Sequence, residues 1–174
     1  LPIYMGKEFS ILIDNKKLKA KEGANLLKTA RDNGFDIPYL CYHPKLSATG
    51  ACRLCVIKIR STNEMLMSCT MAVKEGMDII AFDEELENYR KHTLEYLLAE
   101  HNEEEDGSWH DEFHHWLKKY GLDNPKNRRF NKITHLTKYP IDDSSPVLTY
   151  DASKCIKCFR CIKACDEIQG KRVL

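Results

Sequence analysis

The stretch that decides the fold is Gly50-Ala-Cys-Arg-Leu-Cys55, which carries two cysteines in C-x2-C spacing. Cys41 precedes this pair in Cys41-x10-Cys52, and Cys69 follows it in Cys55-x13-Cys69. The spacing is not typical of a zinc site, and the small residues around the pair let the backbone wrap closely around a bound group. We expect the C-x2-C pair to bind one iron of a two-iron cluster, and Cys41 and Cys69 to bind the second iron.

The residues on both sides of this stretch have the pattern of a small α+β domain. Strand-like runs, separated by turn residues, are predicted at 9–14, 18–21, 55–60, 65–69 and 77–82. A turn is predicted at 15–17. Leu26 and Ala30 lie at helical spacing, so we expect a helix that begins near Asn25 and stops at Gly34. The expected architecture is one helix covering a mixed sheet.

An acidic region follows this domain. Between residues 83 and 112, twelve Asp and Glu residues stand against two basic residues. Apolar residues recur at three and four over Glu84 to Glu100, which predicts an amphipathic helix with Asp83 as its N-cap. A second helix, rich in aromatic residues, is predicted from Trp109 to Tyr120. We expect a solvated helical connector here, and a docking face for a basic partner is the alternative.

Histidines are concentrated in the same region. His110 and His114 are four residues apart, so on a helix they could hold a metal ion with the help of a carboxylate. We expect instead that these histidines, with His92, His101 and His115, are exposed polar residues on the helices.

The last cysteine group, Cys155-x2-Cys158-x2-Cys161-x3-Cys165, has the spacing of a [4Fe-4S] ferredoxin. Three successive cysteines in a tight turn converge on one cubane, and the fourth binds the other cluster. Asp166 stands where proline usually follows the fourth cysteine. Cys155, Cys158 and Cys161 therefore need a fourth ligand from outside this chain, and Cys165 needs three. We expect the sequence to be the N-terminal fragment of a longer protein, or a subunit completed by others.

Composition excludes several classes of function. Lys and Arg number 27 against 26 Asp and Glu, for a formal net charge of +1, so no global basic field for nucleic acid is present. No apolar run reaches the length of a membrane span, and no signal peptide is visible. In the cytoplasmic protein that we expect, two groups of four cysteines favour metal clusters over disulfides. No catalytic triad, phosphate loop or dinucleotide fingerprint marks a substrate-converting site.

Several segments resemble one family. Ile37-Pro-Tyr-Leu-Cys-Tyr-His43, Gly50–Cys55, Met67-Ser-Cys-Thr70 and the region from Asp151 to Gly170 are similar to the ferredoxin-like N-terminal iron-sulfur region of NAD-linked redox complexes. This family includes the large iron-sulfur subunit of complex I, the catalytic subunit of multimeric iron-only hydrogenases, the diaphorase small subunit of soluble nickel-iron hydrogenases and the alpha subunit of NAD-dependent formate dehydrogenase.

The resemblance implies a division into four parts. A β-grasp domain at 1–82 would hold a [2Fe-2S] cluster on Cys41, Cys52, Cys55 and Cys69. An acidic helical segment at 83–123 and a linker at 124–149 would follow. The start of a two-[4Fe-4S] bacterial-ferredoxin-like domain at 150–174 would carry the last four cysteines.

One departure from the family lies in the acidic segment. Family members carry a His-x3-Cys-x2-Cys-x5-Cys site for another [4Fe-4S] cluster after the first long helix. His101 matches its start, but Glu105, Ser108 and His114 occupy the cysteine positions. We expect this cluster to be absent, and the aromatic helix to fill the space with a packed core.

The function implied by the resemblance is the transfer of single electrons. The clusters would connect a flavoprotein subunit that binds NAD(H) to another redox site, such as that of a formate dehydrogenase or hydrogenase. Flavin and NAD would lie on partner subunits, among further iron-sulfur or catalytic subunits. The alternatives are a zinc-stabilised binding or scaffold module that docks through its acidic helix, and a self-contained small ferredoxin.

Overall fold

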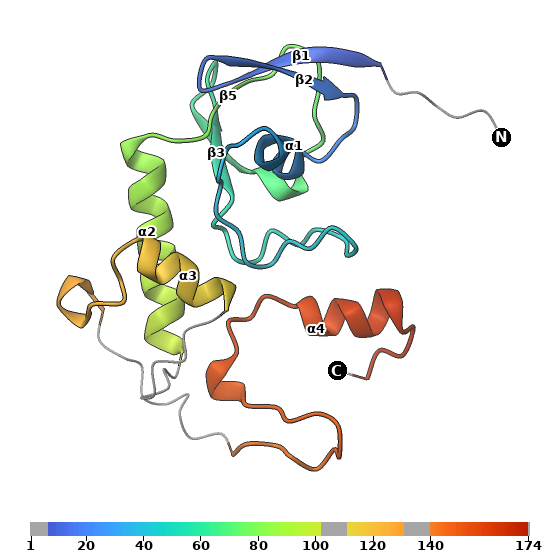
Figure 1. The fold of residues 1–174 in the computed structure, drawn as a ribbon, viewed down its shortest axis with the longest axis vertical. Coiled ribbons are helices and arrows are strands. Elements are labelled where there is room, and N and C mark those ends of the chain that lie inside the picture. The colour runs from blue at the N-terminus through green and yellow to red at the C-terminus, as the bar shows by residue number, and fades with distance from the viewer. Residues whose placement is uncertain (1–6, 102–110, 131–139, 174) are drawn as a thin grey trace. The chain divides into compact units, whose positions relative to one another are not determined.

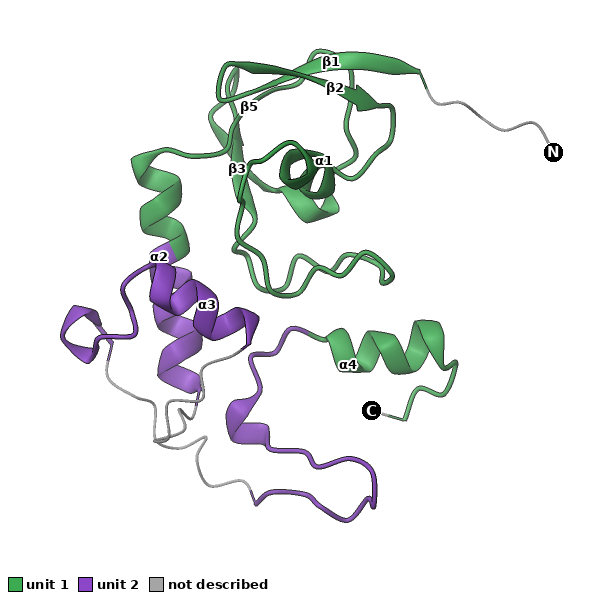
Figure 2. Cartoon of the chain, viewed as in Figure 1, with its two compact units in different colours: residues 1–90, 159–174 green, residues 91–158 purple. Residues whose placement is uncertain are grey.

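The computed structural model describes residues 7–101, 111–130 and 140–173, and Figure 1 shows its strands and helices. The chain divides into two compact units (Figure 2): residues 1–90 with 159–174, and residues 91–158. The boundary between the two units falls inside a helix.

The first unit begins with a hairpin of β1 (Glu8–Ile13) and β2 (Lys16–Lys21). Alternate residues of β1 are buried, as in a strand with one face on a core. Asp14 and Asn15 form the turn with φ values of 47° and 64°, which a two-residue hairpin turn of this hand requires and which Asp and Asn tolerate. The predicted turn at 15–17 was therefore placed too late, and β2 is longer than predicted.

Three further strands complete a mixed sheet: β3 (Val56–Ile59), β4 (Glu64–Met67) and β5 (Asp78–Ile80). The strand order is β2-β1-β5-β3-β4, with β1 and β5 parallel and the other neighbours antiparallel. The three predicted strands are confirmed, each with shorter bounds. After β4 the chain enters a 3₁₀ turn, η1 (Ser68–Thr70), instead of continuing as a strand to 69.

One helix, α1 (Leu26–Asp32), covers a face of this sheet (Figure 1). The helix begins near Asn25, as predicted, and Asn25 is its N-cap, because the Asn25 side chain accepts a hydrogen bond from the Lys28 N–H at 3.0 Å. Gly34, with φ of 88°, follows the helix. The buried core between helix and sheet includes Ile11, Ile13, Leu26, Leu27, Ala30, Ile57 and Ile79. The predicted α+β fold with one helix on a mixed sheet is thus confirmed for this region.

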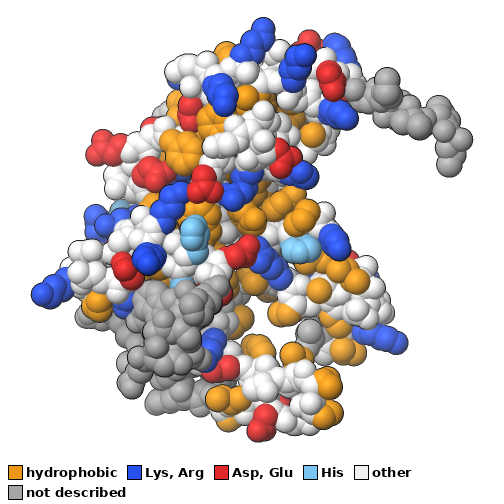
Figure 3. Space-filling view, in the orientation of Figure 1, with side chains coloured by type: hydrophobic (Ala, Val, Ile, Leu, Met, Phe, Trp, Pro, Cys, Tyr) orange, Lys and Arg blue, Asp and Glu red, His pale blue; other side chains and the backbone are white. Residues whose placement is uncertain are grey.

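The outer edge of the sheet is basic. β2 is an edge strand, and its exposed residues are all lysines: Lys16, Lys17, Lys19 and Lys21. Lys and Arg side chains are prominent on the surface over β1 and β2, with acidic side chains among them (Figure 3). Charged side chains on an edge strand oppose pairing with a strand of another molecule. This effect explains the exposed lysines of β2.

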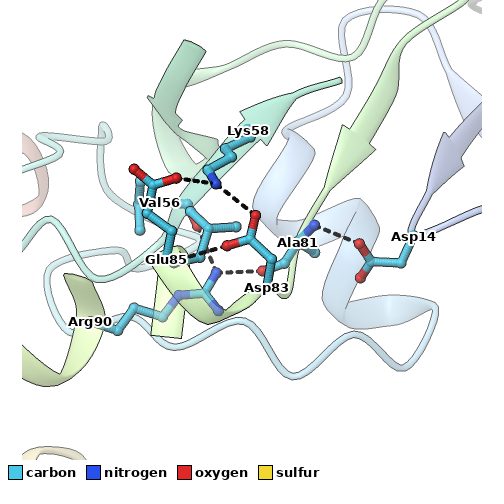
Figure 4. Close-up of polar contacts among 8 residues, drawn as sticks. Asp14, Val56, Lys58, Ala81, Asp83, Glu85 and Arg90 are labelled. Carbon is cyan, nitrogen blue, oxygen red and sulfur yellow. Dashed lines mark hydrogen bonds and ion pairs between the residues drawn. The ribbon is translucent and has the colours of Figure 1, made fainter. Parts of the chain in front are cut away.

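Helix α2 (Glu84–Glu100) has the predicted bounds and begins at the predicted cap. The Leu86 N–H donates to Asp83 Oδ1 at 2.8 Å, which satisfies one free amide of the first turn. Lys58 on β3 binds the carboxylates of Asp83 at 2.7 Å and Glu85 at 2.5 Å (Figure 4). The start of α2 is therefore attached to the sheet.

Arg90 provides a second attachment of α2 to the sheet. Its side chain is fully buried, and Nη2 donates to the carbonyl oxygens of Val56 at 2.6 Å and Ala81 at 2.8 Å (Figure 4). Nη1 binds Glu87 at 2.5 Å. One guanidinium thus joins the beginning of β3 and the chain after β5 to the same helix.

In the second unit, helix α3 (Glu112–Lys119) follows Asp111, whose side chain accepts from the His114 N–H at 2.9 Å. The predicted helix from Trp109 to Tyr120 is confirmed over these residues, while Trp109 and His110 lie outside the described residues. Phe113, Trp116 and Leu117 are buried.

Short elements make up the rest of this unit. They are η2 (Pro125–Asn127), an isolated bridge between Asp142 and Tyr150, and η4 (Ala152–Lys154).

The C-terminal residues belong to the first unit. Helix α4 (Arg160–Lys163) continues into a π-helical turn, η5 (Ala164–Ile168). Among the residues that the structure describes, no helix is long and apolar enough to cross a membrane.

Candidate metal centres

The first four cysteines are buried free thiols in the first unit. Cys41 and Cys52 are 5% exposed, and Cys55 and Cys69 are fully buried. The β3–β4 ladder pairs Val56 with Met67, so Cys55 and Cys69, just outside its end, are brought together. Residues far apart in the sequence therefore meet because of the register of one strand pair.

Hydrogen bonds connect the four thiols. A hydrogen bond from Cys52 and a second one from Cys69 lower the pKa of Cys41, although burial raises it. The hydrogen bond with Cys41 raises the pKa of Cys52, and burial raises it further. A hydrogen bond from Cys69 likewise lowers the pKa of Cys55, and the hydrogen bonds with Cys41 and Cys55 raise the pKa of Cys69. These contacts show that the sulfur atoms lie next to one another, as the ligands of one cluster must.

The polypeptide fixes the backbone of each ligand segment. The Leu40 N–H donates to Cys52 Sγ at 3.4 Å. The Ser68 hydroxyl donates to the Cys55 carbonyl oxygen at 2.7 Å, and Asn25 Nδ2 donates to the Cys69 carbonyl oxygen at 2.6 Å. Such contacts orient the ligands of a metal centre before the metal binds.

The loop before β3 depends on left-handed backbone conformations. Gly50 has φ of 66°, and a Cβ atom there would lie 3.4 Å from Thr70 Cγ2. Arg53, between the two cysteines of the C-x2-C pair, has φ of 58°. Gly50 therefore serves both the turn and the close approach of two segments.

The donor set fits a two-iron cluster. All four side chains of the group are free cysteines, and a [2Fe-2S] cluster takes four cysteine thiolates, which it spreads over two irons.

The last four cysteines are divided between the two units. Cys155 is exposed and Cys158 is half-buried in the second unit, while Cys161 is exposed and Cys165 is buried in the first. The Lys157 N–H donates to Cys155 Sγ, and the Val173 N–H donates to Cys165 Sγ, both at 3.4 Å.

The backbone beside Cys158 has an unusual conformation. Lys157 and Phe159, on either side of this cysteine, have φ values of 55° and 62°. Successive left-handed and right-handed residues turn backbone N–H groups toward a common concave side, which suits an anionic metal cluster. This local chain geometry is compatible with the predicted cubane ligation.

The expectation that the histidines of the acidic region are exposed holds for His115, while His92 is half-buried. It is wrong for His101 and His114. His101 is 6% exposed and His114 is 8% exposed. Their rings lie 5.5 Å apart, with the Phe113 ring 5.1 Å from that of His101. His114 Nδ1 also contacts Asp111 Oδ1 at 2.9 Å. The first and last positions of the family's His-Cys motif therefore come together in a packed aromatic core.

Two contributors to the first site were not recognised from the sequence. Asn25 was predicted only as the approximate start of a helix, although an Asn side chain can also donate through its amide, as it does here to Cys69. Arg90 was counted only as one of two basic residues in an acidic region. A lone arginine facing the apolar side of an amphipathic helix was the available signal.

Comparison with known proteins places the first site in a family. Residues 6–81 match the 2Fe-2S iron-sulfur cluster binding domain. The chain is 30% identical over 175 residues to a subunit of the NADH-quinone oxidoreductase of Buchnera aphidicola subsp. Baizongia pistaciae (strain Bp), over 92% of this chain and 18% of the relative. It is 31% identical over 164 residues to the corresponding NADH-quinone oxidoreductase subunit of Escherichia coli (strain K12), over 88% of this chain and 17% of the relative. The chain thus spans less than a fifth of the length of these relatives.

A solved structure is similar over most of the chain. It is the NAD+-reducing [NiFe]-hydrogenase in the H2-reduced state, with a TM-score of 0.81 and 28% identity, covering 95% of this chain and 69% of that chain. The predicted resemblance to the iron-sulfur region of NAD-linked redox complexes is confirmed by these matches.

Proposed function

Because residues 6–81 belong to the family of 2Fe-2S iron-sulfur cluster binding domains, we propose that this chain transfers single electrons within an NADH-linked redox complex. The observation that carries the proposal is the group of four buried free cysteines in the chain before β3 and in η1. A bound cluster exchanges one electron at a time, near about −400 mV for plant-type [2Fe-2S] centres. The chain's own residues hold the thiolates, exclude water and aim backbone groups at them.

We assign the [2Fe-2S] ligands as Cys41, Cys52, Cys55 and Cys69 within a β-grasp domain at 1–82. The C-x2-C pair of Cys52 and Cys55 would bind one iron. Cys41 and Cys69, whose thiols contact each other, would bind the second.

The C-terminal cysteines belong to [4Fe-4S] sites in the same proposal. Cys155, Cys158 and Cys161 would bind one cubane and Cys165 another, with the remaining ligands from outside this chain, in a domain that begins at 150. The ferredoxin spacing and the left-handed residues on both sides of Cys158 support the assignment. The segments 83–123 and 124–149 would be connectors, without the third cubane of the family.

The partners follow from the relatives. Their names describe NADH-quinone oxidoreductase and an NAD+-reducing hydrogenase, so a flavoprotein subunit that binds NAD(H), and further iron-sulfur or catalytic subunits, would exchange electrons with this chain in the cytoplasm. Flavin would convert hydride pairs into single electrons. The chain itself would carry electrons without converting a substrate.

The experiment that tests the proposal is metal and sulfide analysis with visible and EPR spectra of the purified protein. We expect a brown protein with iron, acid-labile sulfide and a [2Fe-2S] signal on reduction. A colourless protein with stoichiometric zinc would contradict electron transfer and favour the binding-module alternative.

A further inference from the structure

The loop that carries Cys41 contacts the segment that carries Cys161 and Cys165, although more than a hundred residues separate them. Both lie in the first unit. Arg160 Nη2 donates to the carbonyl oxygen of Tyr42 at 2.7 Å, one residue after Cys41. The two proposed cluster-binding segments are therefore in direct contact.

Ser47, in the same loop, is bound through all of its polar groups. Its N–H donates to Glu167 Oε2 at 2.7 Å, and its hydroxyl donates to Glu167 Oε1. Lys163 Nζ donates to the Ser47 carbonyl oxygen at 2.7 Å and lies 3.5 Å from Glu167 Oε1. The side chains of Lys163 and Glu167 are 20% and 31% exposed. Ser47 itself is exposed, so the stabilisation comes from several charge-assisted hydrogen bonds acting together, which an isolated surface ion pair does not provide.

The residues that bind the loop and the two cysteines lie at different positions around the helix. Arg160, Lys163 and Glu167 follow one another at three and four, so they share one helical face. Cys161 and Cys165 lie one position and two positions away from that series. One face of the helix can therefore bind the loop, while the thiols of Cys161 and Cys165 remain available to a metal cluster.

We propose that Arg160, Lys163 and Glu167 are positioning residues, which hold the loop of Cys41 against the C-terminal cysteine segment and so fix the separation of the [2Fe-2S] and [4Fe-4S] sites. The inference rests on the function proposed above. Electron transfer between clusters slows steeply as their separation grows, so a fixed contact maintains a constant rate.

The test compares Glu167→Ala and Lys163→Met with Asp166→Ala in the assembled complex, where the remaining [4Fe-4S] ligands are supplied, and wild type below means the same complex without these substitutions. Asp166 is a matched control because it lies beside Glu167 but binds Arg172 Nε, at 2.5 Å, instead of the loop. The first measurement is hydrogen-deuterium exchange of the peptide that contains Ser47. The second is microwave power saturation of the reduced [2Fe-2S] EPR signal, which relaxes faster when another paramagnetic cluster is close.

We expect the Ser47 amide to exchange about tenfold faster in the Glu167 variant, as the loss of a hydrogen bond to a charged group implies. We also expect the [2Fe-2S] signal of Glu167→Ala and Lys163→Met, which we call the clamp variants, to saturate at lower microwave power. The signal of Asp166→Ala should be unchanged. Unchanged exchange and unchanged saturation in the clamp variants would overturn the inference.

The two proposals fail in different ways. A wild-type protein without any [4Fe-4S] signal would contradict the assignment of the C-terminal cysteines and the fixed separation of two clusters, while the [2Fe-2S] assignment would stand. A wild-type protein with both signals, whose saturation does not change in the clamp variants, would contradict the positioning role alone. Glu167→Gln keeps the size of the side chain and repeats the test if Glu167→Ala does not fold.

Discussion

The two cysteine groups of this chain are supported by different kinds of secondary structure. The first group lies in the chain before β3 and in the turn after β4 of a five-stranded sheet, and all four of its thiols are buried. The second group lies on a turn and a short helix, with Cys155 and Cys161 exposed and only Cys165 buried. A sheet holds ligands in place through packing and backbone pairing, whereas a short helix needs the metal or another segment to hold it.

The difference bears on how we expect each site to form. The four thiols that we assign to the first site come from one compact unit, and side chains such as Asn25 and Ser68 hold their backbone. In the second group, residues with φ above zero lie on both sides of Cys158, and Cys161 and Cys165 lie on the segment that contacts the loop of Cys41. We therefore expect the first site to be preorganised by the fold and the second to depend more on its cluster.

Replacement of a ligand should have the largest effect, because it should remove the cluster of one cysteine group and leave that of the other. In Cys55→Ser we expect complete loss of the [2Fe-2S] EPR signal, because a fully buried ligand is removed from a site without a spare thiol. The [4Fe-4S] signals should remain. The matched variant Cys161→Ser should have the opposite effect, and EPR with iron analysis distinguishes them. If Cys55→Ser leaves the [2Fe-2S] signal intact, the ligand assignment is wrong.

Removal of the Arg90 side chain tests whether the sheet supports the first site. Arg90→Met leaves the carbonyl oxygens of Val56 and Ala81 without their partner inside the protein. We expect the free energy of unfolding to fall by about 3 kcal/mol, together with lower occupancy of the [2Fe-2S] site.

Denaturant unfolding measures this loss, and Lys91→Met on the same helix serves as the control. The control should cost less than about 0.5 kcal/mol. Equal losses in the two variants would show that the Arg90 hydrogen bonds contribute little.

The sequence predicted the elements and the ligand set more fully than their connections. Hydrophobic spacing predicted α2 with its bounds, because Asp83 and the apolar residues after it act locally. The buried role of Arg90 depends on carbonyl groups from β3 and from the chain after β5, and no local pattern encodes that. His101 and His114 were placed on the surface for the same reason: their burial comes from the packing of α3 residues such as Phe113.

A smaller effect is expected from Gly50, which lies in the loop of the first cysteine group. Gly50→Ala would place a Cβ atom 3.4 Å from Thr70 in a left-handed conformation, at a cost of about 1 to 2 kcal/mol. Gly34→Ala is a matched control, because its φ is also positive but no atom lies within 4 Å of the new Cβ.

Both glycine variants should lose stability in thermal unfolding, but only Gly50→Ala should lose its [2Fe-2S] cluster faster, as followed by visible absorbance under a chelator. Equal rates of cluster loss would show that the close approach of this loop to Thr70 does not matter.

The smallest effect should come from the surface charges at the start of α2. Burial raises the pKa of Asp83, but hydrogen bonds from Lys58 and from the Leu86 N–H outweigh it, so the pKa lies below the ordinary value of 3.8. A lowered pKa means that Asp83 stabilises the fold above pH 3.8 and that this contribution is lost as the pH falls through the lowered pKa. Asp83→Asn keeps a good N-cap and loses the charge. We expect a loss of less than about 1 kcal/mol near neutral pH, because the pair is partly exposed.

Denaturant unfolding of both proteins across pH tests this prediction, since the difference between them should vanish in acid. A difference that persists once the pH is below the lowered pKa of Asp83 would show that cap geometry, and not the charge of Asp83, is responsible. Either result separates surface charge from the buried Arg90 contacts, which do not titrate in this range. If charge contributes as little as expected, the first cysteine group is held by packing and buried hydrogen bonds, whereas the segment of Cys161 and Cys165 is joined to the loop of Cys41 through the charged side chains of Lys163 and Glu167.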